Sequence, residues 1–321
     1  MRILLTGAAG FIGFHTAKTL LDRGDEVVGV DNLNSYYQVS LKEARLAQLE
    51  PYDGFSFTRA DIADRDAFLK RFKDEPFDAI VHLAAQAGVR YSIGHPFEYA
   101  DSNLVGHLTM LEMARAQSDL KHLVYASSSS VYGGNTKVPF SETDAVDHPV
   151  SLYAATKRSC ELMSHTYSHL YGIPQTGLRF FTVYGPWGRP DMALWTFTEK
   201  LLQGEPIHVF NNGDHKRDYT YIDDIVDGVL KVLDQPPADA STARLYNIGN
   251  NRPEELLRFI NVIEQATGKK AEMVMEPMQS GDVHTTYADI TAINNEFGFE
   301  PKTTLDEGVP RFVDWFRGYN G

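Results

Sequence analysis

The chain opens on an apolar run that leads directly into a glycine-rich turn. Ile3-Leu4-Leu5 is followed by Thr6-Gly7-Ala8-Ala9-Gly10-Phe11-Ile12-Gly13. A strand, a glycine turn and a helix in this order let backbone amides approach a dinucleotide pyrophosphate, and the helix N-terminus adds its positive dipole. Such a loop also serves as a plain turn, so its surroundings must decide. The predicted contacts to the dinucleotide are Gly7, Gly10, Phe11, Ile12 and Gly13, with a helix over residues 11–23.

A second apolar run favours NAD as this dinucleotide. Glu26-Val27-Val28-Gly29-Val30 ends in Asp31. A carboxylate at the end of the second strand accepts hydrogen bonds from the adenosine ribose and repels a 2′-phosphate, which favours NAD over NADP. Asn32 is assigned to the same site. Asp61 and Ile62, after the third predicted strand, are candidates for adenine contact, although an Asp that caps the strand is an equal interpretation.

Strand and helix patterns alternate through the first half of the chain. Strands are predicted near Ile3 and Val27 and over 55–57, 79–82 and 123–125, which indicates an α/β fold with a Rossmann-type, doubly wound parallel sheet. Residues 33–50 are predicted as an irregular loop before a short helix.

The alternation fades after residue 181, and turns with Pro and Gly become frequent. Further helices are predicted over 195–203, 222–233 and 253–267. We expect an NAD-binding domain over 1–181 with a returning segment at 216–249. A smaller C-terminal substrate-binding lobe is expected over 182–215 and 250–321, with the cleft facing the strand ends.

The composition restricts the partners and the compartment. The net charge of −13 disfavours nucleic acid and anionic membranes as partners. Cys160 is the only cysteine, so no disulfide forms within the chain, and neither a basic-apolar leader nor a long apolar run is found. A cytoplasmic location is expected. The histidines lack paired ligand spacing, so no metal is expected.

Two motifs in the middle of the chain carry hydroxyl and ammonium groups. Tyr153 and Lys157 are four residues apart, on one face of a predicted helix. The earlier strand at 123–126 runs into Ser127-Ser128-Ser129-Ser130-Val131-Tyr132-Gly133. Each motif alone has an ordinary structural interpretation, as a helix face and a serine-rich turn. Together with the glycine turn they point to one cleft.

In this combination the chain resembles the extended short-chain dehydrogenases/reductases of the nucleotide-sugar epimerase and dehydratase group, over essentially its full length. The resemblance implies NAD as cofactor, Tyr153 and Lys157 as catalytic and cofactor-binding residues, and Ser128 as the hydrogen-bond partner of the reacting hydroxyl. A phenolate base needs cations beside it, and Lys157 and the nicotinamide ring of NAD⁺ supply them. The resemblance also assigns cofactor contacts to Leu83, Ala84 and Ala85.

The neighbours of Ser128 narrow the reaction. Relatives that dehydrate the sugar carry acidic residues where this chain has Ser129 and Ser130, and those that decarboxylate a UDP-uronic acid typically carry Glu at the Ser130 position. Elimination of water needs a further acid and base, which hydroxyls do not supply. Epimerisation is therefore favoured, with both serines as substrate contacts.

Two further runs resemble the UDP-glucuronate 4-epimerases. In the run from Arg179 to Met192, the Arg before Pro-Asp-Met pairs with the sugar carboxylate in that family, so Arg189 is the predicted clamp. Thr182 stands where hexose 4-epimerases usually have Asn. The run 83–92 adds Gly88, Val89 and Arg90 as predicted sugar contacts. For both Arg189 and Arg90 the alternative is a solvated or salt-bridged surface group.

Downstream residues are matched to the nucleotide. Arg217, in an Arg-Asp-Tyr run, takes the diphosphate role that this run has in the family. Gln279 stands where many relatives have a second Arg, which weakens a doubly charged phosphate clamp. Asp282 is a candidate for the UDP ribose, or an ordinary turn residue. Val209 and Phe210 are candidates for the floor of the uracil site.

The resemblance implies an isomerase that interconverts UDP-glucuronate and UDP-galacturonate through a transient 4-keto intermediate. It also implies a homodimer, in which helices predicted over 96–117 and 153–171 pair as a four-helix bundle. The alternatives are a UDP-hexose (glucose/galactose) 4-epimerase, a UDP-glucuronate decarboxylase and an NAD-sensing regulatory protein. A sensor needs no proton-transfer set, so Ser128, Tyr153 and Lys157 argue against it.

Overall fold

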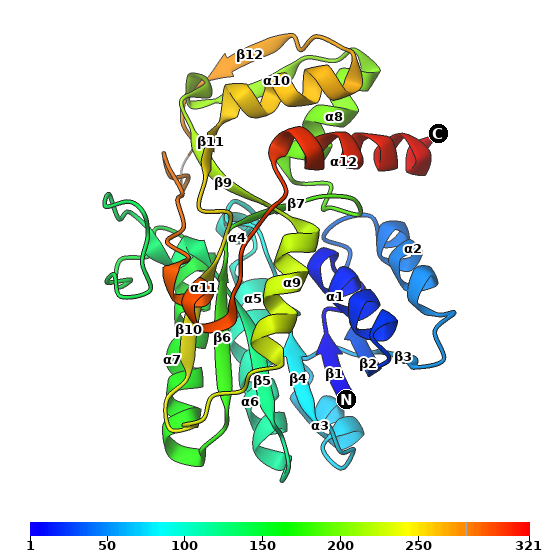
Figure 1. Ribbon diagram of the computed structural model, residues 1–321, viewed down its shortest axis with the longest axis vertical. Coiled ribbons are helices and arrows are strands. Elements are labelled where there is room, and N and C mark those ends of the chain that lie inside the picture. Colours follow the sequence, from blue (N-terminus) through cyan, green and yellow to red (C-terminus); the bar gives the residue numbers. More distant parts are fainter. Residues whose placement is uncertain (280) are drawn as a thin grey trace.

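A seven-stranded parallel sheet forms the centre of the larger part of the molecule (Figure 1). The computed structural model describes residues 1–279 and 281–321, so Ser280 lies outside the described residues. The strand order is β10-β6-β5-β4-β1-β2-β3. These strands are β1 (Arg2–Thr6), β2 (Glu26–Asp31), β3 (Phe55–Arg59), β4 (Ala79–His82), β5 (His122–Ser128), β6 (Gln175–Phe180) and β10 (Arg244–Ile248).

Helices cover both faces of this sheet. Along β1, Ile3 and Leu5 belong to one buried cluster and Leu4 to the other, because successive side chains of a strand point to opposite faces. The first cluster includes side chains of α1 (Phe11–Asp22), α2 (Val39–Leu49) and α9 (Ile222–Leu233). The second includes side chains of α3 (Arg65–Phe72) and α6 (Gly106–Ala116), with α7 (Leu152–Tyr171) against it. The predicted Rossmann-type fold is confirmed, and burial on both faces explains its apolar strands.

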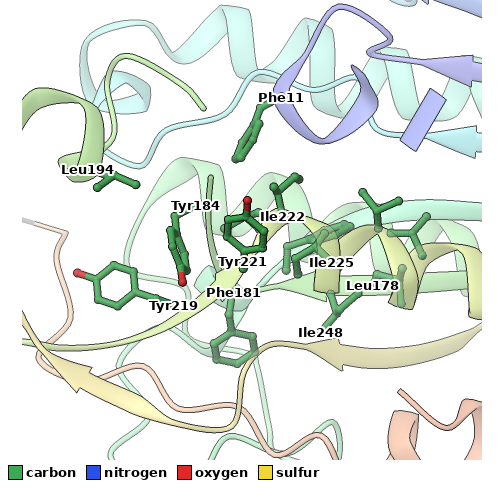
Figure 2. Packing of buried hydrophobic residues seen from close by; sticks show 14 of the residues in the cluster. Phe11, Leu178, Phe181, Tyr184, Leu194, Tyr219, Tyr221, Ile222, Ile225 and Ile248 are labelled. Carbon is green, nitrogen blue, oxygen red and sulfur yellow. The ribbon is translucent and has the colours of Figure 1, made fainter. Parts of the chain in front are cut away.

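The C-terminal part lies beyond the carboxyl ends of the central strands (Figure 1). One small sheet has the order β11-β9-β7, and another pairs β12 with β8. Figure 2 shows that the two parts share one core, with Phe11 of α1, Tyr184 of β7 and Leu194 of α8 in the same cluster. The elements are β7 (Thr182–Tyr184), α8 (Ala193–Gln203), β8 (Ile207–Phe210), β9 (Lys216–Tyr221), β11 (Pro253–Glu255), α10 (Leu256–Thr267), β12 (Met273–Glu276) and α12 (Leu305–Asn320). α11 (Thr291–Phe297) packs instead against β10 and α9 of the larger part (Figure 1).

Two predicted helices differ from the observed elements. The prediction of helix from 253 is wrong at its start, because Pro253–Glu255 pairs antiparallel with β9 and the helix begins at Leu256. Within 96–117, α5 (Pro96–Tyr99) and α6 are separated by a π-helix over Ala100–Val105. Its Asn103 side chain accepts from the Gln86 amide at 2.8 Å and donates to Thr156 Oγ1 at 3.0 Å. The wider turn thus accompanies a buried polar contact between the β4 loop and α7.

The segment 216–249 contributes to both parts. β9 pairs within the small sheet, whereas α9 packs on α1 and β10 completes the edge of the large sheet. The predicted division into two lobes therefore stays a prediction. Short helical turns complete the described chain at α4 (Tyr91–Gly94), Ser129–Tyr132 and Asn211–Gly213. None of the helices in the described part of the chain has both the length and the apolar character to span a bilayer.

Candidate active site

A cavity of about 440 Å³ lies where the strand ends of the large sheet meet the C-terminal part. It brings together the glycine turn, the ends of β2, β4 and β5, the start of α7 and the loop before α8. Arg90 and Gln279, and the uracil-floor candidates Val209 and Phe210, lie outside its lining. The predicted site residues that line it are Gly7, Gly10, Phe11, Ile12, Gly13, Asp31, Asn32, Asp61, Ile62, Leu83, Ala84, Ala85, Gly88, Val89, Ser128, Ser129, Ser130, Tyr153, Lys157, Thr182, Arg189, Arg217 and Asp282.

The glycine turn is packed so closely that a side chain would not fit at Gly7 or Gly13. The Gly7 amide donates to the Val30 carbonyl at 2.7 Å. Gly7 has φ of +80°, which favours glycine. A Cβ on Gly13 would lie 1.9 Å from the Gly7 carbonyl oxygen. The N-terminus of α1 therefore reaches the turn because residue 13 has no side chain.

Asp31 lies at the end of β2, beside this turn. Its carboxylate accepts from the Ala9 amide at 3.2 Å and from the Leu33 amide at 2.8 Å. It is 9% exposed. A carboxylate has about four acceptor positions, so further hydrogen-bond capacity remains on the cavity wall. Asp61 accepts from Asn32 Nδ2 at 3.0 Å, which joins the ends of β2 and β3.

β5 and α7 carry Ser128, Tyr153 and Lys157, which together are called the hydroxyl set. Ser128 closes β5, and its Oγ accepts from the Ser130 amide at 3.2 Å and the Ser130 hydroxyl at 2.9 Å. Lys157 is buried, and its Nζ donates to the Ala126 carbonyl of β5 at 2.9 Å. The Tyr153 ring packs edge-on against Tyr99, with centroids 6.0 Å apart. The end of β5 and the first turns of α7 are thereby fixed to each other.

A buried ion pair supports this arrangement from behind. Glu161 of α7 and Arg179 of β6 make two hydrogen bonds, at 2.8 and 2.9 Å, and both side chains are almost fully buried. Ser127 donates to Glu161 at 2.7 Å. The residue before Ser128 is thus fixed by charge-assisted contacts, which are stronger than neutral ones.

The Arg189 guanidinium also has well-defined hydrogen-bond partners. Its Nε and Nη2 donate to the two carboxylate oxygens of Asp191 at 3.0 and 2.5 Å. The Tyr36 hydroxyl donates to the same carboxylate at 3.0 Å. Arg189 lines the cavity, so it is neither a fully solvated group nor a simple surface ion pair.

Arg45 fixes the loop that carries Arg189. It is fully buried on α2 and donates to the Trp187 carbonyl at 2.7 Å, the Gly188 carbonyl at 3.2 Å and the Ala9 carbonyl at 2.8 Å. Burial lowers the pKa of this guanidinium, although it remains charged. Trp187 has φ of +62°, a strained value for a bulky residue. One side chain therefore joins the glycine turn to the Arg189 loop.

The residues that are predicted to contact the nucleotide part of the UDP-sugar lie close together. Arg217 Nη2 donates to Asp282 at 2.7 Å, and its Nη1 donates to the His284 carbonyl at 3.0 Å. Arg90 is 58% exposed, lies 3.7 Å from Asp282 and packs over the Phe210 ring. Gln279 has a buried side-chain amide oxygen, Oε1, without a hydrogen-bond partner among the described residues. The roles of these residues stay predictions.

The prediction missed several residues of the 33–50 loop that line the cavity. Tyr36 reaches Asp191, and the buried Lys42 donates to the Asn34 side chain at 2.7 Å. A pair of adjacent tyrosines in a polar loop was the available signal, but contacts with residues 155 positions away are not visible in a local pattern. Within residues 1–279 and 281–321, no cluster of three or more metal-binding side chains is found.

A doubly wound sheet, a glycine turn and hydroxyl side chains at the strand ends are typical of a dinucleotide-binding enzyme that acts on a substrate hydroxyl. The model of the NAD dependent epimerase/dehydratase family matches residues 3–249. The chain belongs to this family, and the resemblance predicted from the sequence is confirmed.

Named relatives cover nearly the whole chain. A probable UDP-glucuronate 4-epimerase of Rhizobium meliloti is 47% identical, over 98% of this chain and 97% of the relative. The UDP-glucuronic acid 4-epimerase from Bacillus cereus, solved with UDP-glucuronic acid and NAD, has a TM-score of 0.91 at 33% identity, covering 99% and 100% of the two chains. A UDP-glucose 4-epimerase from Thermotoga maritima, solved with UDP-glucose, has a TM-score of 0.90 at 33% identity, covering 100% of both.

Proposed function

We propose that the chain is an NAD-dependent UDP-glucuronate 4-epimerase that interconverts UDP-glucuronate and UDP-galacturonate. The observation that carries the proposal is a single cavity lined by a glycine turn, by the Ser128, Tyr153 and Lys157 set, and by the Arg189 guanidinium. The relatives from Rhizobium meliloti and Bacillus cereus support the same substrate.

The residues at the glycine turn suit NAD. Gly7 and Gly13 let the turn pack against the β4 loop and the N-terminus of α1, because a Cβ at either position would lie within 3 Å of backbone atoms, and the Asp31 carboxylate has acceptor capacity for ribose hydroxyls. Asp31 forms no ion pair among the described residues, although the Lys42 and Arg45 charges act on it, and a carboxylate at this position disfavours a 2′-phosphate. When bound, NAD supplies a reversible hydride acceptor.

The proton transfer is assigned to the hydroxyl set of Ser128, Tyr153 and Lys157. Tyr153 takes the proton of the sugar C4 hydroxyl, and Ser128 hydrogen-bonds the same oxygen. Lys157 lies one turn from Tyr153 on α7 and places a positive charge in the same cavity. Because epimerisation returns a hydride to C4 and a proton to the oxygen on that carbon, the set works in both directions without net redox change.

The uronate group is assigned to Arg189. A guanidinium presents a planar fork of donors that matches a carboxylate. Ser129 and Ser130 line the cavity where an acid and a base would be needed for dehydration, and Ser130 stands where decarboxylases typically carry Glu. Retention of the carboxylate and inversion at C4 are therefore the favoured outcome.

The same protein is proposed to act as a homodimer in the cytoplasm. Apolar side chains on the outer side of α6 and α7 support the dimer, because they are exposed in one chain: Leu108 is 40% exposed and Leu162 is 53% exposed. The lone, buried thiol of Cys160 suits a reducing compartment. Two copies of α6 and α7 would form a four-helix bundle across a two-fold axis.

Proton NMR of the purified protein with UDP-glucuronate, and without added NAD, tests the proposal. The anomeric signal of UDP-galacturonate is the expected product, and it would also report retained cofactor. A UDP-pentose product would instead assign decarboxylation. No change, even after NAD is added, would contradict the proposal.

One rival reaction has a specific observation in its favour. The UDP-glucose 4-epimerase from Thermotoga maritima has the same fold over the whole chain. The same NMR experiment with UDP-glucose separates the two: a kcat/KM for UDP-glucose that matches or exceeds that for UDP-glucuronate would favour the neutral hexose.

A further inference from the structure

The guanidinium of Arg189 is held on one side only. Asp191 occupies Nε–H and one N–H of Nη2. An arginine has five N–H groups, so three remain, including both on Nη1. No acceptor among the described residues bonds to Nη1. A second carboxylate can therefore bind Arg189 without displacing Asp191.

The two partners of this pair lie differently with respect to the cavity. Arg189, Tyr36 and Met192 line it, whereas Asp191 lies outside the lining. Asp191 thus binds the guanidinium from outside the cavity lining. An acceptor in that position directs the remaining donors of the guanidinium and does not compete for them.

Asp191 is itself fixed and charged. The Tyr36 hydroxyl donates to it at 3.0 Å, and the Tyr36 ring lies 5.9 Å from the Arg189 guanidinium carbon. Burial alone would raise the pKa of Asp191, but the Arg189 charge outweighs burial and holds this pKa below its usual range. Burial and the Asp191 charge raise the pKa of Tyr36 to about 12, so its hydroxyl stays a donor.

The backbone beneath the pair is also restrained. Arg45 holds the Trp187 and Gly188 carbonyls, the two residues before Arg189. With the main chain fixed from α2, the direction of the guanidinium depends on its side-chain partners. Of the described residues, only Asp191 hydrogen-bonds to it.

We propose that Asp191, supported by Tyr36, is a positioning residue that orients Arg189 toward the carboxylate of the sugar and so sets the preference for a uronate over a neutral hexose. This inference rests on the proposed function. Asp191 touches neither the reacting carbon nor the cofactor site, and it acts through Arg189.

Asp191→Asn tests the proposal, with Asp306→Asn as a matched control. Asp306 also pairs with an arginine on the surface, since Arg258 Nη2 donates to it at 2.8 Å, but it lies outside the cavity lining. Binding of UDP-glucuronate, UDP-glucose and UDP is measured by calorimetry, and KM and kcat by NMR. Loss of one charge-assisted restraint should weaken UDP-glucuronate binding about tenfold, mainly in KM.

The other substrates show whether the effect is specific. Affinities for UDP-glucose and UDP should change less than about twofold, and Asp191→Glu should recover part of the UDP-glucuronate affinity. Asp306→Asn should leave all three affinities unchanged. Equal weakening of all three ligands would indicate a general structural role, and tighter UDP-glucuronate binding would identify Asp191 as a competitor; unchanged affinity would exclude any role. Each of these results overturns the proposal.

Failure of the proposed reaction is recognised separately. If the unmodified protein binds UDP-glucuronate in an Asp191-dependent way but forms no UDP-galacturonate, the reaction is wrong and the positioning role stands. If it binds UDP-glucuronate no more tightly than UDP-glucose, the uronate assignment and the positioning role are both overturned.

Discussion

At the scale of the residue, the contacts that hold Tyr153 in the fold do not involve the hydroxyl group that is proposed to transfer the proton. The ring packs against Tyr99, and α7 is anchored to β5 through Lys157 and to β6 through Glu161. No hydrogen bond of the Tyr153 hydroxyl to another described side chain maintains the fold. The hydroxyl is therefore free for chemistry, and its removal should leave the cavity intact.

Tyr153→Phe is predicted to lower turnover roughly 10²- to 10⁴-fold, the usual contribution of a general acid or base. The thermal unfolding midpoint and the amount of co-purified NAD should be unchanged. NMR rates and absorbance of the released cofactor measure the two effects. Tyr171→Phe, at the exposed end of the same helix, is the control and should keep full activity. A Tyr153→Phe protein with near-normal turnover would remove this residue as the base.

At the scale of the element, the approach of α1 to the glycine turn depends on Gly13. Gly13→Ala would place a methyl group 1.9 Å from the Gly7 carbonyl oxygen, so the helix must move away from the turn. We predict a loss of about 1–3 kcal/mol of stability, typical of overpacking, and loss of co-purified NAD.

Gly318→Ala provides the matched control for this prediction. It lies in α12, and a Cβ added at this position would meet no other atom within 4 Å. Alanine in a helix interior is favoured over glycine by roughly 0.5–1 kcal/mol, so a small gain in stability is expected with NAD unchanged. Urea unfolding and cofactor content distinguish the two variants, and an equal response would contradict close packing as the reason for Gly13.

Elements that carry a strong local pattern were predictable from the sequence. The apolar runs of β1 and β2 and the long helix α7 appear as predicted, because period and burial coincide there. Pro253–Glu255 was not predictable as a strand, since its pairing partner β9 is distant in the sequence. The π-helix was missed for a similar reason: Asn103 bonds to Gln86 and Thr156 on two other elements.

The residues of the candidate site also fall into those that a local motif identifies and those that only distant contacts define. The glycine turn, the serine row and the Tyr153/Lys157 pair lie within short segments, so local motifs identified them. Asp191 lies within the run from Arg179 to Met192, but this run does not indicate a role for it, because its bond to Tyr36 links residues 155 positions apart. Arg45 gave no signal at all, since an arginine on a helix normally indicates a solvated face.

At the scale of the whole molecule, the apolar outer side of α6 and α7 carries the dimer proposal. Leu162→Glu would place a charge in the middle of this surface, and burial of an unpaired charge opposes association. We predict a shift from a dimer to a monomer of 36.0 kDa, measured by sedimentation equilibrium. Leu257→Glu, at a 44% exposed position on α10, should remain dimeric. An unmodified protein that is monomeric would contradict the proposal.

Buried histidines give the fold a predictable response to pH. Burial lowers the pKa of His107 to about 3 and that of His122 to about 4, from 6.5. The folded state keeps both rings neutral while the unfolded chain takes up protons below pH 6.5, so this stability is present above the unfolded pKa and is lost as pH falls. At pH values well below 6.5, we predict that the free energy of unfolding decreases by about 1.4 kcal/mol per pH unit for each ring.

Urea unfolding between about pH 7.5 and 5 measures this slope, in a range above most carboxylate titration. His122→Gln should remove from this slope the contribution of one imidazole ring. His165→Gln, at an exposed position of α7, should leave the slope unchanged. A free energy of unfolding that is constant across this range would contradict the prediction.

The contacts of Arg45 limit how this protein can be recombined with its relatives. The side chain links α2 to the glycine turn through Ala9 and to the Arg189 loop through Trp187 and Gly188. A chimera that exchanges the Arg189 loop without α2 risks leaving buried carbonyls without donors, at about 1–3 kcal/mol for each. Substrate loops should therefore be transferred between family members together with residues 39–49, although the two segments are far apart in the gene.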